Sequence, residues 1–163
     1  MSPLSRLPPE ARFGVRFLLM LVLCSVLFWA FSLHLQLGPL QRLIASVSGE
    51  LARWSGGDVY VDRDNIVVRT LTLNINHECT GIFVFMLFAS FVLAYPTSIR
   101  SRLLGIGMGL PALFGINVLR LATLARIVEV YPGAFFYFHE YVWQGVFMVI
   151  VLVGAISWAE RFG

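Results

Sequence analysis

Four apolar runs divide this chain, and their lengths limit its possible folds more than any other feature. They are residues 17–35, 79–95, 103 to about 126, and 141 to about 158. About 20 apolar residues are enough for a helix to cross a bilayer. The chain is 58% hydrophobic and 13% charged, whereas a soluble domain is usually about 25% charged. We therefore expect an all-α integral membrane protein with about four transmembrane helices, in which residues 1–163 form a single membrane-embedded domain.

The segment between the first two runs has a different pattern. Between residues 38 and 54, apolar residues recur at three- and four-residue steps, which predicts an amphipathic helix lying on the outer membrane surface. Residues 59–61 and 66–68 are β-branched or aromatic and flank the turn sequence Arg63-Asp64-Asn65, which predicts a small β-hairpin. Because apolar and polar residues continue to alternate up to residue 75, we expect the second strand to lead directly toward Cys79. A plain extracytoplasmic loop is the alternative.

The arginines predict the orientation in the membrane. The formal net charge is +3, and all twelve basic residues are arginines. With four spans, both termini lie on one side, together with most of the arginines outside the long outer segment. These are Arg6, Arg12, Arg16, Arg100, Arg102 and Arg161. The positive-inside rule makes that side cytoplasmic, so the basic excess reports orientation and predicts no nucleic-acid partner.

Three residues that suit acyl transfer are far apart in sequence but are expected at one depth in the membrane. Cys79 begins the second run at its outer end, Arg120 lies about 25 Å along the third run, and His139 immediately precedes the fourth. A helix N-terminus and a nearby Arg both favour a thiolate. His139 can transfer the thiol proton, and Arg120 can stabilise a thiolate or an oxyanion. The three residues therefore predict a catalytic site on the outer face.

Neighbouring polar residues are candidates for supporting roles. They are Glu78, Thr80, Asn117 and Glu140. Asn117 lies about one helical turn before Arg120 and so on the same helix face. Either Glu140 or Asn117 could orient the imidazole of His139, and the spacing does not choose between them.

The candidates also have purely structural explanations. Arg120 and Arg126 could extend to lipid phosphates at the interface, and His139 could belong to an aromatic belt. Cys24, inside the first run, is interpreted as a buried apolar residue. Gly105 and Gly109 in the third run allow close helix packing and are candidates for a face that receives a substrate helix.

Two other classes of function remain open on the residues alone. His77, Cys79 and His139 could hold a metal ion or form a redox site, since nitrogen and sulfur are zinc ligands. Alternatively, the chain could be a non-catalytic docking or assembly factor that binds tail-anchored helices. Thiol–disulfide exchange is less favoured, because no second cysteine is expected at the depth of Cys79.

Three motifs together resemble the exosortase/archaeosortase family. They are Glu-Cys-Thr-Gly leading the second run, Asn117-Val-Leu-Arg120 in the third, and His139-Glu-Tyr-Val-Trp143-Gln144 entering the fourth. The resemblance covers roughly residues 68–147. It implies a membrane-embedded cysteine protease or transpeptidase in which Cys79, Arg120 and His139 are catalytic. Its implied action is to cleave C-terminal sorting signals of secreted proteins on the extracytoplasmic side, through a thioacyl-enzyme.

The resemblance also implies partners and a location. The implied substrate is a secreted protein ending in a short motif, a transmembrane helix and a basic tail, and the acyl acceptor is a membrane lipid or another nucleophile. No cofactor or metal is implied. Many exosortases have about twice as many helices, so this chain resembles their catalytic half and the shorter members. Histidine at position 139 is exosortase-like, which favours a bacterial source and hence the cytoplasmic (inner) membrane.

Overall fold

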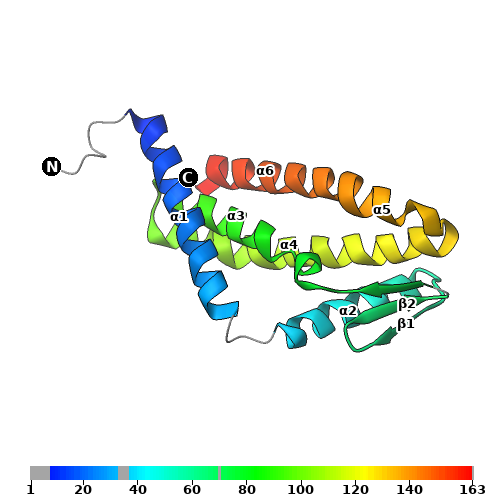
Figure 1. The fold of residues 1–163 in the computed structure, drawn as a ribbon. Coiled ribbons are helices and arrows are strands. Elements are labelled where there is room, and N and C mark those ends of the chain that lie inside the picture. The colour runs from blue at the N-terminus through cyan, green and yellow to red at the C-terminus, as the bar shows by residue number, and fades with distance from the viewer. Residues whose placement is uncertain (1–7, 33–36, 70, 163) are drawn as a thin grey trace.

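The computed structural model describes residues 8–32, 37–69 and 71–162, which are mostly helical (Figure 1). Arg6 and residues 33–35 of the first apolar run lie outside this part. The helices are α1 (Pro9–Ser32), α2 (Gly38–Trp54), α3 (Ile82–Ala94), α4 (Ile99–Val130), α5 (Phe135–Tyr137) and α6 (Trp143–Phe162). The strands are β1 (Val59–Asp62), β2 (Asn65–Val68) and β3 (Leu71–Asn74). Short helical turns complete the path: η2 (His77–Thr80), η3 (Pro132–Ala134) and the π-helical η4 (Phe138–Val142).

The described helices confirm the predicted membrane fold. Three helical stretches are long and apolar enough to cross a bilayer: Pro9–Ala30, Ile99–Val130 and Pro132–Phe162. The fourth apolar helix, α3, has 13 residues, or about 20 Å at 1.5 Å per residue. This is shorter than a hydrocarbon layer of about 30 Å. The chain is therefore an all-α integral membrane protein with a small sheet, in which the second apolar run forms a short helix.

The start of α3 differs from the prediction that this helix begins at Cys79. Gly81 has a φ of 73° and separates the 3-10 turn η2 from α3, which begins at Ile82. Glycine adopts this left-handed conformation without strain because it has no Cβ. An added Cβ at Gly81 would also lie 3.3 Å from Cγ of Asn117. Cys79 therefore belongs to a separate turn outside the membrane helix.

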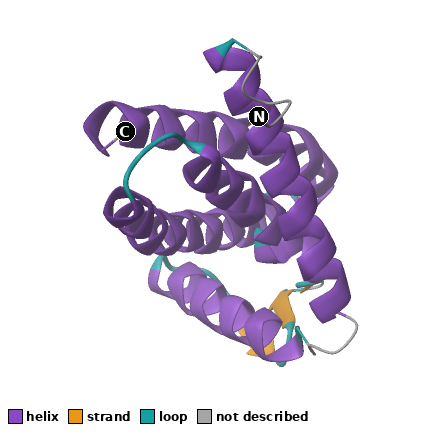
Figure 2. Cartoon of the chain, turned by 90° about the vertical axis from the view of Figure 1, so that its left-hand side faces the viewer, coloured by secondary structure: helices purple, strands orange, loops and turns teal. Residues whose placement is uncertain are grey.

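The long helix α4 connects two packed regions (Figures 1 and 2). Its first half packs with α3 and α6, through a core of Phe88, Val92, Leu113, Val151, Ala155 and Trp158. Its second half packs with α2 and the sheet, through residues that include Ile44, Ile66, Leu121, Leu124 and Val128. Asn117 lies 18 positions after Ile99, or about 27 Å along the helix. The change from one region to the other thus falls almost one bilayer thickness, about 30 Å, from the start of α4.

Helix α1 crosses α3 and is attached through its first turns (Figure 1). The ring of Phe13 lies 5.5 Å from that of Phe91 and 5.8 Å from that of Tyr95, both edge-to-face. None of the most apolar 18-residue window of α1 is buried within the protein. In a membrane protein, such an apolar surface faces lipid.

The bounds of the predicted amphipathic helix are confirmed, but its environment was not foreseen. Its buried residues are Ile44, Ala45, Ser48, Gly49 and Ala52, and they pack against α4 and the sheet. Leu43, Val47 and Trp54 belong to the predicted apolar face and are exposed. Apart from Ile44, the buried residues of this helix are small. For this reason the hydrophobic pattern identified only part of the docked face.

The sheet contains one strand more than predicted. The predicted hairpin is present as β1 and β2, and Arg63 in its turn has a φ of 57°. The second strand does not continue toward Cys79, because the chain reverses after Val68 and Leu71–Asn74 returns as β3, antiparallel to β2. Arg69, at this reversal, has a φ of 49°. The expected continuation was wrong because apolar and polar residues alternate with the same two-residue period before and after the reversal. The sequence pattern of two strands therefore looks like that of one long strand.

The segment between the third and fourth apolar runs, residues 129–139, is mostly helical, and its first residue anchors α4 to the sheet. The side chain of Glu129 is 6% exposed. Its carboxylate accepts a hydrogen bond of 3.2 Å from the backbone N–H of Asp58 and pairs with Arg69 at 3.5 Å and with Arg126. Arg126 is therefore an intramolecular partner of Glu129, which replaces the suggestion that it binds lipid phosphate.

The predicted docking face on α4 takes part in internal packing. A Cβ on Gly105 would lie 2.5 Å from Nε1 of Trp158, and a Cβ on Gly109 would overlap the ring of Phe88. Both glycines therefore pack against aromatic side chains of α6 and α3. Because they also line a cavity between α4 and α6, the docking of a substrate helix at this face stays a prediction.

Replacing Gly109 by alanine is expected to destabilise the protein. The new methyl group would overlap the buried ring of Phe88, and overpacking of this kind costs roughly 1–3 kcal/mol. Thermal unfolding of detergent-purified protein would show a lower Tm. Gly107→Ala is the matched control, because its Cβ would meet nothing within 4 Å. Equal Tm values for the two variants would contradict this packing.

Candidate active site

The turn that carries Cys79 is fixed by an asparagine that sequence reasoning missed. Oδ1 of Asn76 accepts hydrogen bonds from the N–H groups of Glu78 (3.0 Å) and Cys79 (3.1 Å). Asparagine is among the preferred residues for capping a helical turn in this way, and this preference was the available signal. Thr80, predicted as a supporting residue, is fully buried and donates its hydroxyl proton to the carbonyl oxygen of His77 at 2.6 Å. The local sequence thus fixes the position of the thiol.

His139 lies between the thiol and a carboxylate. Its Nε2 is 3.8 Å from Sγ of Cys79, and its Nδ1 is 3.2 Å from Oε1 of Glu140. The ring stacks on Phe135 with 5.2 Å between centroids. This is the order of nucleophile, base and orienting group found in nucleophilic catalysis, and such contacts are often looser without substrate. Of the two candidates for orienting the imidazole, the structure places Glu140 against it.

Asn117 contacts the backbone of the nucleophile turn. Its Nδ2 donates a hydrogen bond of 2.9 Å to the carbonyl oxygen of Cys79. The side chain is fully buried, and its Oδ1 has no hydrogen-bond partner among the described residues. Asn117 therefore fixes the turn to α4, at the level where Arg120 follows on the same face.

Arg120 is buried close to the thiol, and no carboxylate among the described residues pairs with it. The residue is 9% exposed, and its guanidinium carbon lies 5.5 Å from the ring centroid of Phe147. Its Nε is buried and has no hydrogen-bond partner within the described part of the chain. Burying a charged side chain in a membrane protein is costly, and such residues usually serve function. The burial disfavours the alternative in which Arg120 extends to lipid phosphate.

The thiol is not poised as a free thiolate, in contrast to the prediction. Burial raises the pKa of Cys79 above its ordinary value, and the Arg120 charge lowers it only in part. The carboxylates of Glu78 and Glu140 act in the same direction as burial. The helix dipole adds little, because Cys79 precedes α3 by a separate turn. Cys79 is therefore protonated near neutral pH and needs a base, which His139 supplies by position.

Two cavities meet at this site. One, of about 220 Å³, lies beside the sheet and is lined by residues that include Cys79, Ile75 and Leu124. The other, of about 340 Å³, lies between α3 and α6, with Arg120 and Phe147 in its wall. Glu78, His139 and Glu140 border both. The two cavities therefore adjoin each other at these three residues.

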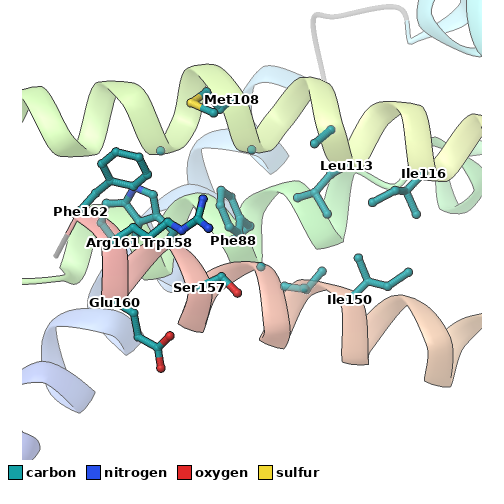
Figure 3. A pocket seen from close by; sticks show the side chains of 15 residues that line it. Phe88, Met108, Leu113, Ile116, Ile150, Ser157, Trp158, Glu160, Arg161 and Phe162 are labelled. Atoms are coloured by element: carbon teal, nitrogen blue, oxygen red, sulfur yellow. The ribbon is translucent and has the colours of Figure 1, made fainter.

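A third cavity is separate from these residues. It has a volume of about 460 Å³ and lies between α4 and α6 (Figure 3). Arg161 and Phe162 lie at one end of it, and Ile116 and Ile150 lie at the other. Neither Cys79 nor His139 lines it.

The residues considered for a metal or redox site do not come together. His77 is exposed, while the contacts of Cys79 and His139 are with each other and with Glu140. Within the described ranges, no group of three His, Cys, Asp or Glu side chains is arranged to hold a metal ion. The geometry therefore favours proton transfer over metal binding at this position.

Comparisons with known proteins identify the family of the chain. The family model of transmembrane exosortases matches residues 6–156. A probable archaeosortase E from Methanocaldococcus jannaschii is 28% identical over 89 residues, covering 55% of this chain and 48% of the relative. The chain thus matches about half the length of that curated relative. No solved structure matches. Because the family model covers most of the chain, the predicted resemblance is confirmed: this multi-pass membrane protein belongs to the exosortase/archaeosortase family.

Proposed function

We propose that the chain is a membrane-embedded cysteine transpeptidase or protease that removes C-terminal sorting signals from secreted proteins. The observation that carries the proposal is the arrangement of the Cys79 thiol, the His139 imidazole and the Glu140 carboxylate beside the buried charge of Arg120. Family membership supports a role in protein sorting. The chemistry itself is inferred from these side chains.

In the proposed reaction, His139 takes the proton from Sγ of Cys79 as sulfur attacks the scissile carbonyl carbon. The guanidinium of Arg120 stabilises the oxyanion of the tetrahedral intermediate. When the C–N bond breaks, His139 returns the proton to the leaving amine, and the upstream part of the substrate remains as a thioester. A second nucleophile, either water or an amine of a lipid or other acceptor, loses a proton to His139 and releases the product.

We place the site on the extracytoplasmic side of a bacterial cytoplasmic membrane, with both termini in the cytoplasm. Arg100 and Arg102 begin α4 and Arg161 ends α6, at the end of the bundle opposite the sheet (Figure 1). The positive-inside rule assigns this end to the cytoplasm. The turn with Cys79 lies nearer the other end, where a secreted substrate is accessible.

Co-expression with a tailed substrate tests this proposal. The substrate is a secreted protein from the same genome that ends in a short motif, an apolar helix and an arginine cluster. The account predicts that its mass falls by that of the tail in cells with the chain and stays unchanged without it. If several such substrates keep their tails while the chain is inserted in the membrane, the protein is not a sorting peptidase, and a docking factor becomes the better account.

Glu140→Gln is expected to lower kcat and to leave KM nearly unchanged. The carboxylate orients His139 and stabilises the imidazolium that forms when the thiol proton is removed. The loss should be smaller than the full contribution of a general base, about 10²–10⁴-fold, because the Glu140 side chain is 47% exposed. Cleavage rates at several substrate concentrations separate kcat from KM. Glu50→Gln, in an exposed pair with Arg53 on α2, is the control, and equal rates for both variants would remove Glu140 from the mechanism.

A further inference from the structure

We propose that the substrate crosses Cys79 in one direction, from the free edge of β3 into the cavity between α3 and α6. Residues before the scissile bond would extend along β3 as a fourth strand, and residues after it would enter the α3–α6 cavity. This inference rests on the proposed function, and it assigns each half of the substrate to a surface of the protein.

The first argument is that the smaller cavity lies at the end of an edge strand. Leu73 and Asn74 at the end of β3, Ile75 and Asn76 directly after it, and Ile66 of β2 line the cavity. Cys79 lines the same cavity, so a peptide that follows β3 to its end reaches the nucleophile. β3 is the last strand in the order β1-β2-β3, and no further strand in the described residues pairs with it. An extended peptide can bind such an edge through main-chain hydrogen bonds.

The hydrogen-bond pattern shows which groups are available at this edge. The N–H of Ile75 donates to the carbonyl oxygen of Asp64 at 2.9 Å, so Ile75 bonds on the β2 side. In an antiparallel ladder, alternate residues direct their backbone groups to opposite sides. Thr72 therefore presents its N–H and carbonyl groups to the free edge, and Asn74 presents its N–H, because its carbonyl oxygen accepts a hydrogen bond of 3.2 Å from the N–H of Asn76. Asn76, two residues further on, holds the turn that positions Cys79, so a strand bound here leads directly to the nucleophile.

The second argument is that the larger cavity belongs to the membrane helices. Apolar side chains of α3 and α6 line it, including Val84, Leu87, Phe147 and Met148. Met148 is 51% exposed and Phe83, opposite it on α3, is 60% exposed, so the cavity opens toward the surrounding lipid. The start of a transmembrane helix is apolar and can pack between these side chains.

The direction follows from the topology of the substrate. Its membrane helix comes after the scissile bond and must enter the bilayer, whereas the sorting motif lies outside. The sheet packs on the second half of α4, and the larger cavity lies between the membrane helices. A substrate that reached Cys79 in the opposite direction would place an apolar helix against the exposed side chains of Thr72 and Asn74.

Disulfide trapping tests both halves of this path. The starting protein is the full chain with Cys24→Ala and Cys79→Ala, so that the substrate stays intact. Asn74→Cys or Met148→Cys is added singly, with Met108→Cys as the matched control, because Met108 is a similarly exposed methionine lining the separate third cavity (Figure 3). The substrate is the tailed protein cleaved in the co-expression experiment, with one cysteine placed shortly before or shortly after the bond that is cut.

The expected pattern is specific for each position. Asn74→Cys should crosslink the upstream substrate cysteine, Met148→Cys the downstream one, and Met108→Cys neither. Reversed pairing, preferential crosslinking at Met108→Cys, or no crosslink at all would overturn the inference, provided the wild-type chain cleaves the same substrate. If the wild-type chain does not cleave it, the proposed function fails first, which distinguishes the two claims.

A proline at position 72 tests the strand pairing separately. Thr72→Pro removes an N–H that points away from β2, a position where edge strands tolerate proline. We expect kcat/KM for the tailed substrate to fall roughly 3- to 10-fold, the effect of one hydrogen bond, while Tm stays unchanged. Thr72→Val keeps the N–H and separates loss of the side chain from loss of the hydrogen bond, so its kcat/KM should exceed that of Thr72→Pro. Equal kcat/KM values for the two variants would contradict pairing at this edge.

Discussion

Replacing Cys79 by alanine is expected to abolish removal of the substrate tail. In the proposed reaction the thiol is the group of the protein that bonds to the scissile carbonyl carbon, and loss of a nucleophile from a cooperating set lowers kcat by on the order of 10⁶-fold. The tailed substrate should therefore keep its full mass. Membrane insertion should be unaffected, because Cys79 holds its turn through backbone hydrogen bonds that alanine retains.

Two further variants make the Cys79 result specific. Cys24→Ala changes the other cysteine, which lies in α1, and should leave cleavage at the wild-type level. Cys79→Ser keeps the size of the side chain but gives a much weaker nucleophile, so it should also be inactive. If the chain were a docking factor, Cys79→Ser would leave its function unchanged. Full tail removal by the Cys79→Ser variant would refute nucleophilic catalysis by Cys79.

Replacing Arg120 by lysine is expected to lower cleavage by about 10²–10³-fold, the usual effect of losing one oxyanion donor. Lysine keeps the positive charge, but it lacks the planar set of N–H donors that guanidinium presents. The buried Nε of Arg120 has no hydrogen-bond partner among the described residues. Such a group is available to a substrate oxyanion. Cleavage rates of purified protein on the tailed substrate provide the measurement.

Arg126→Lys is the matched control for this prediction. Arg126 lies on the same helix and pairs with Glu129, and lysine can form that pair as well. This variant should retain wild-type activity. If Arg120→Lys were also fully active, simple positive charge would explain the role of Arg120, and a hydrogen-bonded oxyanion would not be needed.

The membrane fold was predictable because apolar run length is a direct physical requirement for crossing a bilayer. The amphipathic period likewise placed α2 within its observed bounds. What could not be read from the pattern depends on single residues. Gly81 separates η2 from α3, so the helix begins at Ile82, three residues after the predicted start. The reversal at Arg69 produces a third strand without disturbing the alternation of apolar and polar residues.

The residues of the site could be predicted from the sequence, but the pKa of the thiol could not. Unusual polar residues at one depth identified Cys79, Arg120 and His139, and the structure places the thiol, the imidazole and the guanidinium close together. The choice of Glu140 over Asn117 required coordinates, because both residues are near His139 or Cys79 in the expected topology. Burial of the thiol, which raises its pKa, results from tertiary packing, and no local motif reports it.

The central claim is that the reaction passes through a thioester on Cys79, and adding hydroxylamine during cleavage tests it most directly. Membranes with the wild-type chain would be incubated with the tailed substrate, with and without hydroxylamine, and the C-terminus of the shortened product would be identified by mass spectrometry. Hydroxylamine attacks thioesters readily and does not cleave ordinary peptide bonds. The account predicts a product that ends in a hydroxamate when hydroxylamine is present. Tail removal that yields only a free carboxylate in its presence would contradict the thioacyl-enzyme.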